Sequence, residues 1–230
     1  MKRVDFWFDP ISPFAWLAFD ALPQALAGLN VAVDYRPLLF GAVLQHWGQK
    51  GPAEIEPKRA WTYRQVQWLA HRQGLRLRMP AQHPFNPLAL LRLAVACTPP
   101  GAAGPNRRVV QALFEHVWAA DGEDGEDGER GKDPTDPARL AALAAALAPR
   151  RDPNSDEVKA DLRQSTDAAL ALGLFGVPSF HAEGRLFWGL DALPMLAAAL
   201  AGDAWFDGPE WADAAVLRPG VVRRARPDSR

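Results

Sequence analysis

The start of the chain has a hydrophobic pattern that changes from strand to helix and back to strand. Residues 4–8 are a short aromatic and β-branched run, which is typical of a buried strand. Ser12 and Pro13 then supply an N-cap and a proline for the first helical position, so they predict a helix over residues 13–27. Residues 30–39 alternate as a second strand. This order predicts a βαβ unit, with a parallel strand pair and a right-handed crossover.

The middle of the chain has a helical period. Four segments place apolar residues at helical spacing: residues 61–73, 87–97, 106–120 and 137–148. Residues 121–136 interrupt them with eight acidic and two basic side chains among repeated glycines, a local charge of −6. We expect a solvated, mobile loop there, and an acidic interaction segment is the alternative.

The last third of the sequence returns to mixed elements. Residues 155–172 form an amphipathic helical pattern, and residues 179–182 and 185–188 flank a Glu-Gly turn as the strands of a hairpin do. Asp191 is expected to cap a final helix that ends near residue 201.

This order of elements predicts an α/β protein with a thioredoxin-like core that is split by an inserted all-α domain. The expected core combines residues 1–40 and 173–202, the helical insertion spans residues 41–172 with the acidic loop at 121–136, and residues 203–230 form a C-terminal tail. The tail ends in an arginine-rich run. We expect it to be frayed or to pack on a neighbour, with RNA or membrane binding as the alternative.

Composition removes several classes of function. The 230 residues include 26 basic and 27 acidic side chains, and a net charge of −1 gives no overall attraction for nucleic acid or an anionic membrane. Cys97 is the single cysteine, which excludes an intramolecular disulfide, a CxxC pair and any multi-thiolate metal site. We therefore expect no metal site. Early acidic residues and short apolar runs argue against a signal peptide or a membrane span, so we expect a cytoplasmic protein.

The candidate chemistry lies at two turns of the expected core. Thioredoxin-like folds stabilise an anion where the first strand meets the first helix, and Ser12 stands there in place of an attacking thiol. A serine without a neighbouring base is a poor nucleophile but a good hydrogen-bond donor to a ligand's thiolate. Ser12 acting only as an N-cap is the alternative. Pro178 precedes the third strand, where a cis bond would turn the backbone toward a thiol ligand; an ordinary trans proline is the alternative.

Four motifs together carry a resemblance to a known family. The segments FDPISPFAW, PFNPLALLRLA, GVPSF and FWGLD occur in this order. The chain therefore resembles the 2-hydroxychromene-2-carboxylate isomerase family, which is similar to kappa-class glutathione transferases and to DsbA-like oxidoreductases. The resemblance implies a homodimer that uses glutathione as a cofactor to isomerise a small aromatic substrate. A kappa-like transferase and a non-catalytic thiol-binding module are the alternatives.

The resemblance also assigns roles to residues around glutathione. Ser12 would face the sulfur, while the backbone of Val177, before cis Pro178, would pair with the cysteinyl part. The remaining implied contacts are Gly189, Leu190 and Asp191 at the γ-glutamyl end, and Gln49 and Lys58 elsewhere on the cofactor. Leu190 stands where the family usually has Gln or Ser, and Gln49 where it tends to have Asn.

The substrate side is expected to be aromatic and basic. Trp47 and Trp188 flank the implied site and suit an aromatic ring. Arg59 would pair with a carboxylate, and Asn86 would offer an amide to the substrate. Surface charge is the alternative for Lys58 and Arg59, and a helix cap is the alternative for Asn86.

Overall fold

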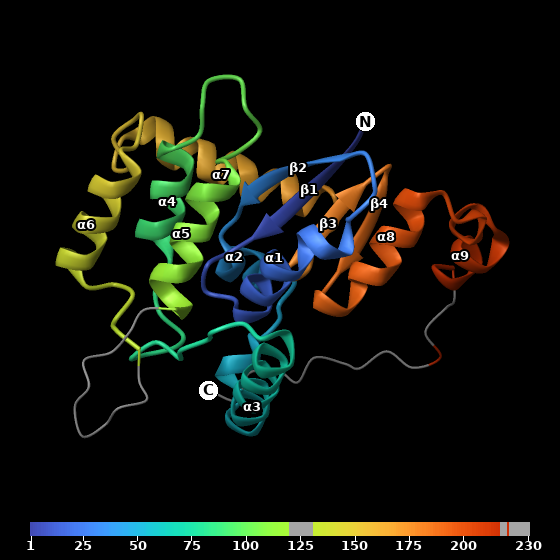
Figure 1. The fold of residues 1–230 in the computed structure, drawn as a ribbon, viewed down its shortest axis with the longest axis horizontal. Helices are drawn as coiled ribbons and strands as arrows, with labels where there is room; N and C mark the ends of the chain where they lie inside the picture. The colour runs from blue at the N-terminus through green and yellow to red at the C-terminus, as the bar shows by residue number, and fades with distance from the viewer. Residues whose placement is uncertain (120–130, 217–219, 221–230) are drawn as a thin grey trace.

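A four-stranded mixed sheet forms the centre of the computed structural model, which describes residues 1–119, 131–216 and 220 (Figure 1). The strands are β1 (Lys2–Phe8), β2 (Val31–Pro37), β3 (Ser179–Ala182) and β4 (Arg185–Trp188), in the spatial order β2-β1-β3-β4. β1 pairs with β2 in parallel, whereas the β1–β3 and β3–β4 pairs are antiparallel. The predicted βαβ unit and the hairpin are both confirmed.

Helices cover the sheet and extend from it. They are α1 (Pro13–Ala25), α2 (Phe40–His46), α3 (Glu56–Gln73), α4 (Leu88–Ala96), α5 (Arg107–Trp118), α6 (Pro137–Leu147), α7 (Asp156–Ala171), α8 (Leu193–Ala201) and α9 (Pro209–Ala214). Short 3₁₀ turns are η1 (Pro52–Glu54), η2 (Leu190–Ala192) and η3 (Ala204–Asp207). In Figure 1, α6 and α9 lie at opposite ends of the molecule and α3 projects below the sheet. The α/β thioredoxin-like fold with helices inserted into the core is therefore confirmed.

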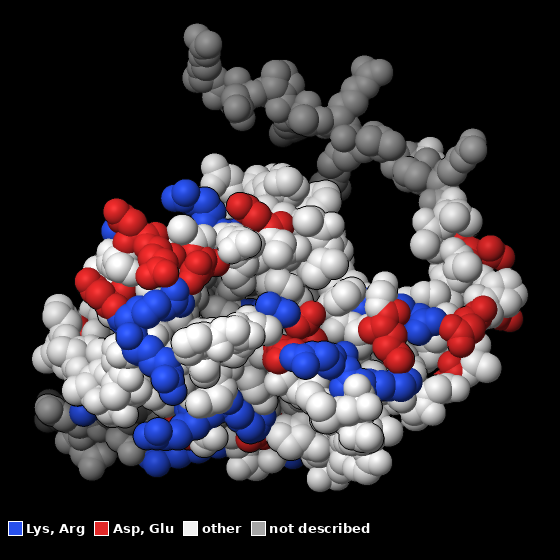
Figure 2. Space-filling view, turned by 90° about the horizontal axis from the view of Figure 1, so that it is seen from above, with Lys and Arg blue, Asp and Glu red and all other residues white. Residues whose placement is uncertain are grey.

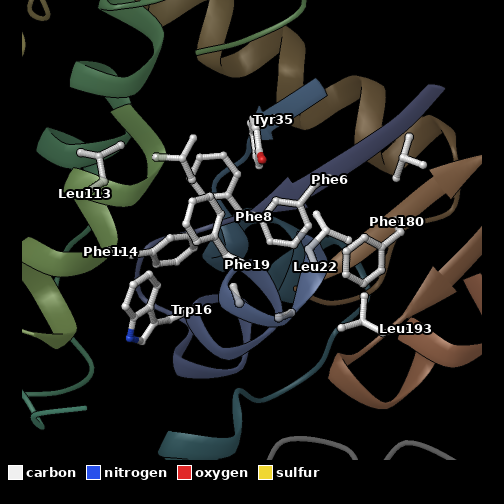
Figure 3. Packing of buried hydrophobic residues seen from close by; sticks show 14 of the residues in the cluster. Phe6, Phe8, Trp16, Phe19, Leu22, Tyr35, Leu113, Phe114, Phe180 and Leu193 are labelled. Atoms are coloured by element: carbon white, nitrogen blue, oxygen red, sulfur yellow. The ribbon is translucent and has the colours of Figure 1, made fainter. Parts of the chain in front are cut away.

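The main core lies where α1 packs on one face of β1. Alternation along the strand points Phe6 and Phe8 to this face, where both are fully buried. Figure 3 shows Phe19 of α1 and Phe114 of α5 beside them, with ring centroids of Phe8 and Phe114 5.5 Å apart. Phe180 of β3 closes the other side of Phe6 at 5.2 Å. This aromatic packing fixes the start of α1 against the end of β1.

The opposite face of β1 carries a second, smaller core. Trp7 points to this side, between Leu38 and Val43 on one hand and Ala169 of α7 on the other. Val177 belongs to the same cluster. The segment that leads into β3 is therefore packed directly behind the first strand.

The inserted helices differ from the sequence prediction at their beginning. α2 was not predicted, because the residue before it, Leu39, gives no side-chain cap and its apolar run resembles a strand end. α3 begins at Glu56, five residues before the predicted start, with a proline at the start of the helix. Two predicted ligand-binding residues belong to this region, since Gln49 follows α2 and Lys58 lies in α3.

Only the last part of the predicted acidic loop lies in the described residues. Residues 120–130 lie outside them. Asp133 accepts hydrogen bonds from the Thr135 backbone and hydroxyl, and Asp136 caps α6 by accepting from the Arg139 N–H. The Pro134 carbonyl accepts from the His116 ring. Residues 131–136 are thus held to α5 and α6, and the expected mobility is wrong for them.

The beginning of the C-terminal tail is folded, so the expectation of a frayed tail is wrong up to α9. Phe206 of η3 is buried, and Trp211 of α9 packs on it at 5.2 Å. Both rings contact Phe187 of β4, at 6.0 and 6.1 Å. The arginine-rich end, residues 217–219 and 221–230, lies outside the described residues.

The surface charges are mixed in sign. On the face shown in Figure 2, Lys and Arg side chains lie beside Asp and Glu side chains. The described part of the chain also contains ion pairs such as Arg36–Asp5 at 2.9 Å and Lys2–Glu183 at 3.0 Å. Within the described residues, no helix is long and apolar enough to cross a membrane.

Candidate functional site

Ser12 lies where the sequence placed it, at the start of α1. It is 8% exposed, and its Oγ accepts a hydrogen bond from the Ala15 N–H at 3.3 Å, so the N-cap role is confirmed. The hydroxyl also donates to the carbonyl of Val177 at 3.4 Å. The first turn of a helix leaves backbone N–H groups without intrahelical partners and carries the positive end of the dipole. The serine therefore occupies a place that favours an anion.

The predicted turn before β3 meets Ser12. The Val177–Pro178 peptide bond is cis, as expected from its position. The Pro178 carbonyl accepts a hydrogen bond from the Gly189 N–H at 2.9 Å. Residues from three distant segments, Ser12, Val177–Pro178 and Gly189, are thus joined by consecutive hydrogen bonds.

The Gly189 turn orients Asp191 but does not use it as a cap. Gly189 has φ +99°, and a Cβ there would overlap the Asp191 carboxylate, so glycine is required on both grounds. The chain enters α8 through η2, which contains Asp191, and the residue before α8 is Ala192. The predicted cap is wrong, since neither turn has a side-chain cap. The carboxylate of Asp191 is exposed instead.

Leu190 faces the core rather than solvent. Its side chain packs against the clusters that contain Leu17 of α1 and Leu193 of α8. An apolar residue is favoured there because η2 rests on α1. Leu190 can therefore offer a ligand its backbone only.

Three exposed aromatic side chains surround the segment that leads to Pro178. The Trp47 indole donates to the Leu174 carbonyl at 2.7 Å, and the Trp188 ring lies 4.9 Å from that of Phe175. Trp47, Phe175 and Trp188 are 46%, 37% and 54% exposed, which is high for such large apolar groups. A Cβ on Gly176 would collide with the Trp188 indole. The structure brings the two predicted tryptophans to one loop and adds Phe175, which sequence reasoning missed.

Most of the polar site residues that were predicted in the insertion have exposed side chains. The side chains of Gln49, Lys58 and Asn86 are exposed. Asn86 accepts from the Leu88 N–H at 3.1 Å at the start of α4, which agrees with the helix-cap alternative. Arg59 is half-buried and donates to the Ala53 carbonyl at 3.3 Å. None of these side chains is hydrogen-bonded to the Ser12 turn among the described residues.

Asp9 lies directly beneath the serine turn and was not predicted as a site residue. Its carboxylate is fully buried and accepts from the N–H groups of Ile11 and Phe40, both at 3.0 Å. Burial raises its pKa to about 7, although these two hydrogen bonds act in the opposite direction. An aspartate that ends an otherwise apolar strand was the available sequence signal. Asp9 joins the β1–α1 turn to the start of α2.

His83, Tyr63 and Trp118 form a second group that sequence reasoning missed. The His83 ring lies 5.5 Å from that of Tyr63 and 5.4 Å from that of Trp118. Hydrogen bonds from His83 and Trp118 reach Ile11 and Pro10, just before Ser12. Burial lowers the pKa of His83. Their sequence separation from the serine turn left no local pattern to reveal them.

Neither the Ser12 turn nor the Val177–Pro178 turn contains a cysteine. Cys97 is buried at the end of α4, and burial raises the pKa of its thiol, which makes it less reactive. Among residues 1–119, 131–216 and 220, no group of three or more His, Cys, Asp or Glu side chains is placed to hold a metal ion.

Comparisons with known proteins identify relatives of this chain. The chain is 26% identical over 220 residues to rat glutathione S-transferase kappa 1, covering 90% of this chain and 94% of the relative. It is also 26% identical over 199 residues to 2-hydroxychromene-2-carboxylate isomerase of Pseudomonas putida, covering 86% and 93%.

The fold of a solved 2-hydroxychromene-2-carboxylate isomerase matches with a TM-score of 0.71 at 24% identity, over 92% of this chain and 98% of that one. The sequence model of the DsbA-like thioredoxin domain matches residues 3–201, from β1 to the end of α8. Since this span contains the sheet, the inserted helices and both turns of the candidate site, the chain belongs to the DsbA-like thioredoxin domain family.

Proposed function

We propose that this protein is a glutathione-dependent isomerase of the 2-hydroxychromene-2-carboxylate type. The observation that carries the proposal is the meeting of the Ser12 hydroxyl, the start of α1 and the Val177–Pro178 turn at one place that lacks a protein thiol. One relative is named as a glutathione transferase and another as an isomerase, which supports enzymatic activity. In this proposal glutathione supplies a thiolate that adds to a conjugated double bond of the ring-opened aromatic pyruvate and is released unchanged.

The residues present fit such a cofactor. The Ser12 hydroxyl would donate a hydrogen bond to the thiolate, and in doing so would exchange its present bond to the Val177 carbonyl for one to a charged acceptor. That carbonyl would then be free to accept from the peptide of the ligand. The exposed Asp191 carboxylate, held over Gly189, suits the ammonium group of the γ-glutamyl end.

The outer parts of the proposed site would bind carboxylates and the aromatic ring. Lys58 and Arg59 supply positive charge at the start of α3, for the glycyl carboxylate and the substrate carboxylate respectively. Gln49 would add an amide to the cofactor and Asn86 one to the substrate. Trp47 and Trp188 would pack against the aromatic ring.

Two measurements test this proposal. Calorimetry should detect saturable binding of glutathione and weaker binding of S-methylglutathione, which cannot form a thiolate. Ultraviolet absorbance should then follow interconversion of the chromene and benzylidenepyruvate forms at substoichiometric glutathione, with total free thiol constant. Undiminished isomerisation without glutathione would contradict the proposal.

A kappa-like transferase is the second candidate, because a kappa-class relative matches at the same 26% identity as an isomerase and covers 90% of this chain, against 86%. It needs the same thiolate but transfers it to an electrophile. Loss of one free thiol per turnover would favour this function. Saturable glutathione binding with no turnover of any conjugated enone would instead indicate a thiol-binding module. We also propose that the protein is a cytoplasmic homodimer. Light scattering of the purified full chain tests the dimer by measuring its mass.

A further inference from the structure

Two successive peptide groups before Ser12 are each held at both ends. In the Pro10–Ile11 peptide, the carbonyl accepts from Trp118 Nε1 at 2.8 Å and the N–H donates to Asp9 Oδ1 at 3.0 Å. In the Ile11–Ser12 peptide, the carbonyl lies 2.8 Å from His83 Nε2 and the N–H donates to the Asp9 carbonyl at 3.0 Å. Neither peptide plane can rotate without breaking a hydrogen bond in a largely buried place. The direction of the Ser12 hydroxyl depends on these planes.

The bond to Ile11 defines the protonation of His83. A carbonyl oxygen only accepts, so His83 Nε2 must carry a proton for this bond to form. In the neutral ring the other nitrogen, Nδ1, is then an acceptor. Burial lowers the pKa of His83, which favours this neutral form.

Tyr63 is the partner that favours the required tautomer. Its Oη lies 2.8 Å from His83 Nδ1 and 3.0 Å from the His83 carbonyl. The hydroxyl has a single proton, and the His83 carbonyl is a second acceptor for it; when the hydroxyl donates to Nδ1 over the shorter contact, it stabilises the tautomer with the proton on Nε2. The opposite tautomer would place two acceptors, Nε2 and the Ile11 oxygen, 2.8 Å apart.

We propose that Tyr63 and His83 are positioning residues that fix the Ile11–Ser12 peptide and thereby aim the Ser12 hydroxyl at the thiolate. The role of Ser12 in this inference rests on the proposed function, whereas the fixed peptide does not. His83 acts by donating from Nε2, and Tyr63 acts only through His83. Neither residue needs to touch substrate or cofactor.

A matched pair of substitutions at His83 separates this role from a general structural one. His83→Gln keeps an N–H donor near the position of Nε2, whereas His83→Asn keeps the amide but is too short to donate there. We expect His83→Asn to lower the thiolate fraction of bound glutathione and kcat by about three- to tenfold, with KM for the aromatic substrate little changed. His83→Gln should remain within about twofold of the wild type.

Tyr63→Phe completes the test as a double-mutant cycle. Alone it should lower the thiolate fraction by about two- to fivefold, because the tautomer is no longer selected. In the His83→Gln background it should have no further effect, since an amide has no tautomer to select. Equal losses from Tyr63→Phe in both backgrounds, or equal effects of His83→Gln and His83→Asn, would overturn the inference.

Hydrogen exchange of the Ser12 amide provides a measurement without glutathione. His83→Asn should speed this exchange by about tenfold relative to His83→Gln, while amides of α6 and α7 keep their rates. If the wild type binds no glutathione, the proposed function fails, but this exchange still decides whether His83 fixes the peptide. Unchanged exchange in His83→Asn would overturn the inference even if the wild type proves to be an active isomerase.

Discussion

The two ends of the candidate site are built in opposite ways. At the serine turn, Asp9 and Trp118 are fully buried. From the Pro10 carbonyl to the Ser12 N–H, each backbone carbonyl and N–H group is hydrogen-bonded. At the outer end, the side chains of Gln49 and Lys58 are exposed. The fold has therefore fixed the part that would meet the sulfur, and it leaves the parts that would meet the ends of the ligand to be ordered on binding.

This contrast has an energetic meaning. A group held before the ligand arrives does not lose conformational freedom on binding, so its full interaction is available to the reacting atom. An exposed side chain must give up rotamer freedom and hydration, which leaves a small net gain. Substitutions at the serine turn should therefore have much larger effects than substitutions at the outer end.

The largest effect is expected for Ser12→Ala. It removes one hydrogen bond to a charged sulfur, worth about 1.5–3 kcal/mol, so the thiolate fraction of bound glutathione should fall by about ten- to a hundredfold. Titration of the thiolate absorbance of the bound cofactor measures this change. Ser155→Ala is the matched control, because Ser155 caps α7 with the same 3.3 Å bond to a backbone N–H. Both variants should lose about 1 kcal/mol of stability. Superimposable thiolate titrations for the two would remove Ser12 from the chemistry.

Asp9→Asn should change how stability depends on pH. The pKa of Asp9 is about 7 in the folded protein, against 3.8 for an aspartate in water, so the folded state holds the extra proton between these values. The free energy of unfolding should therefore fall as pH rises from about 4 to about 7, by up to about 1.4 kcal/mol per pH unit from this group. Urea unfolding across pH 4–8 should show a flatter profile for Asp9→Asn than for the wild type.

Asp133→Asn serves as the control for that experiment. Hydrogen bonds from Thr135 lower the pKa of Asp133, so its contribution is present above its ordinary pKa and is lost only as pH falls further. The difference in stability between this variant and the wild type should be constant from pH 5 to 8. A constant difference for Asp9→Asn as well would show that Asp9 is ionised throughout this range.

A smaller effect is expected at the aromatic wall. Trp188→Ala should raise KM for the aromatic substrate about two- to tenfold and leave that for glutathione unchanged, because one ring pair is worth about 0.5–1.5 kcal/mol. Trp205 has a similar exposed fraction, 46% against 54%, but lies in η3 at the far side of β4. Steady-state kinetics of Trp205→Ala should match the wild type. An equal rise in both KM values for Trp188→Ala would show that the indole only supports the loop around Gly176.

The smallest effect is expected for Lys58→Gln. An exposed ion pair contributes about 0.2–1 kcal/mol, so KM for glutathione should rise about two- to fivefold and the difference should vanish at high salt. Lys159→Gln is the control, since Lys159 is a half-buried lysine on α7 that pairs with Asp156. A change above tenfold at Lys58 would mean that the outer end is ordered before the ligand binds.

The sequence predicted those parts of the fold that depend on local pattern. Residues 4–8 and the Ser12–Pro13 pair located β1 and α1, because strand alternation and helix caps act over a few residues. Asp191 misled, since a cap-forming residue after a strand does not reveal that the chain passes through η2 first. α2 lacked any cap to mark its start.

The candidate site was predictable only where it coincides with a motif. Ser12 and Pro178 were found from their places in the expected thioredoxin-like core, and Val177 because a family resemblance carries it. His83 and Trp118 were not, since they lie 72 and 108 positions from the carbonyls they hold. Such contacts are created by the packing of α5 and of the segment between α3 and α4 against the β1–α1 turn, and no periodicity within one segment encodes them.

The aromatic group at the C-terminal side of the sheet has a consequence for the behaviour of the protein at high concentration. β4 is an edge strand, and the family match ends at residue 201, before Phe206 and Trp211 cover Phe187. Open strand edges beside bare apolar rings are templates for pairing between molecules. A chain that stopped after α8 would expose such a ring next to such an edge. We therefore expect the η3–α9 segment, which covers Phe187 on β4, to limit pairing between molecules at this edge of the sheet.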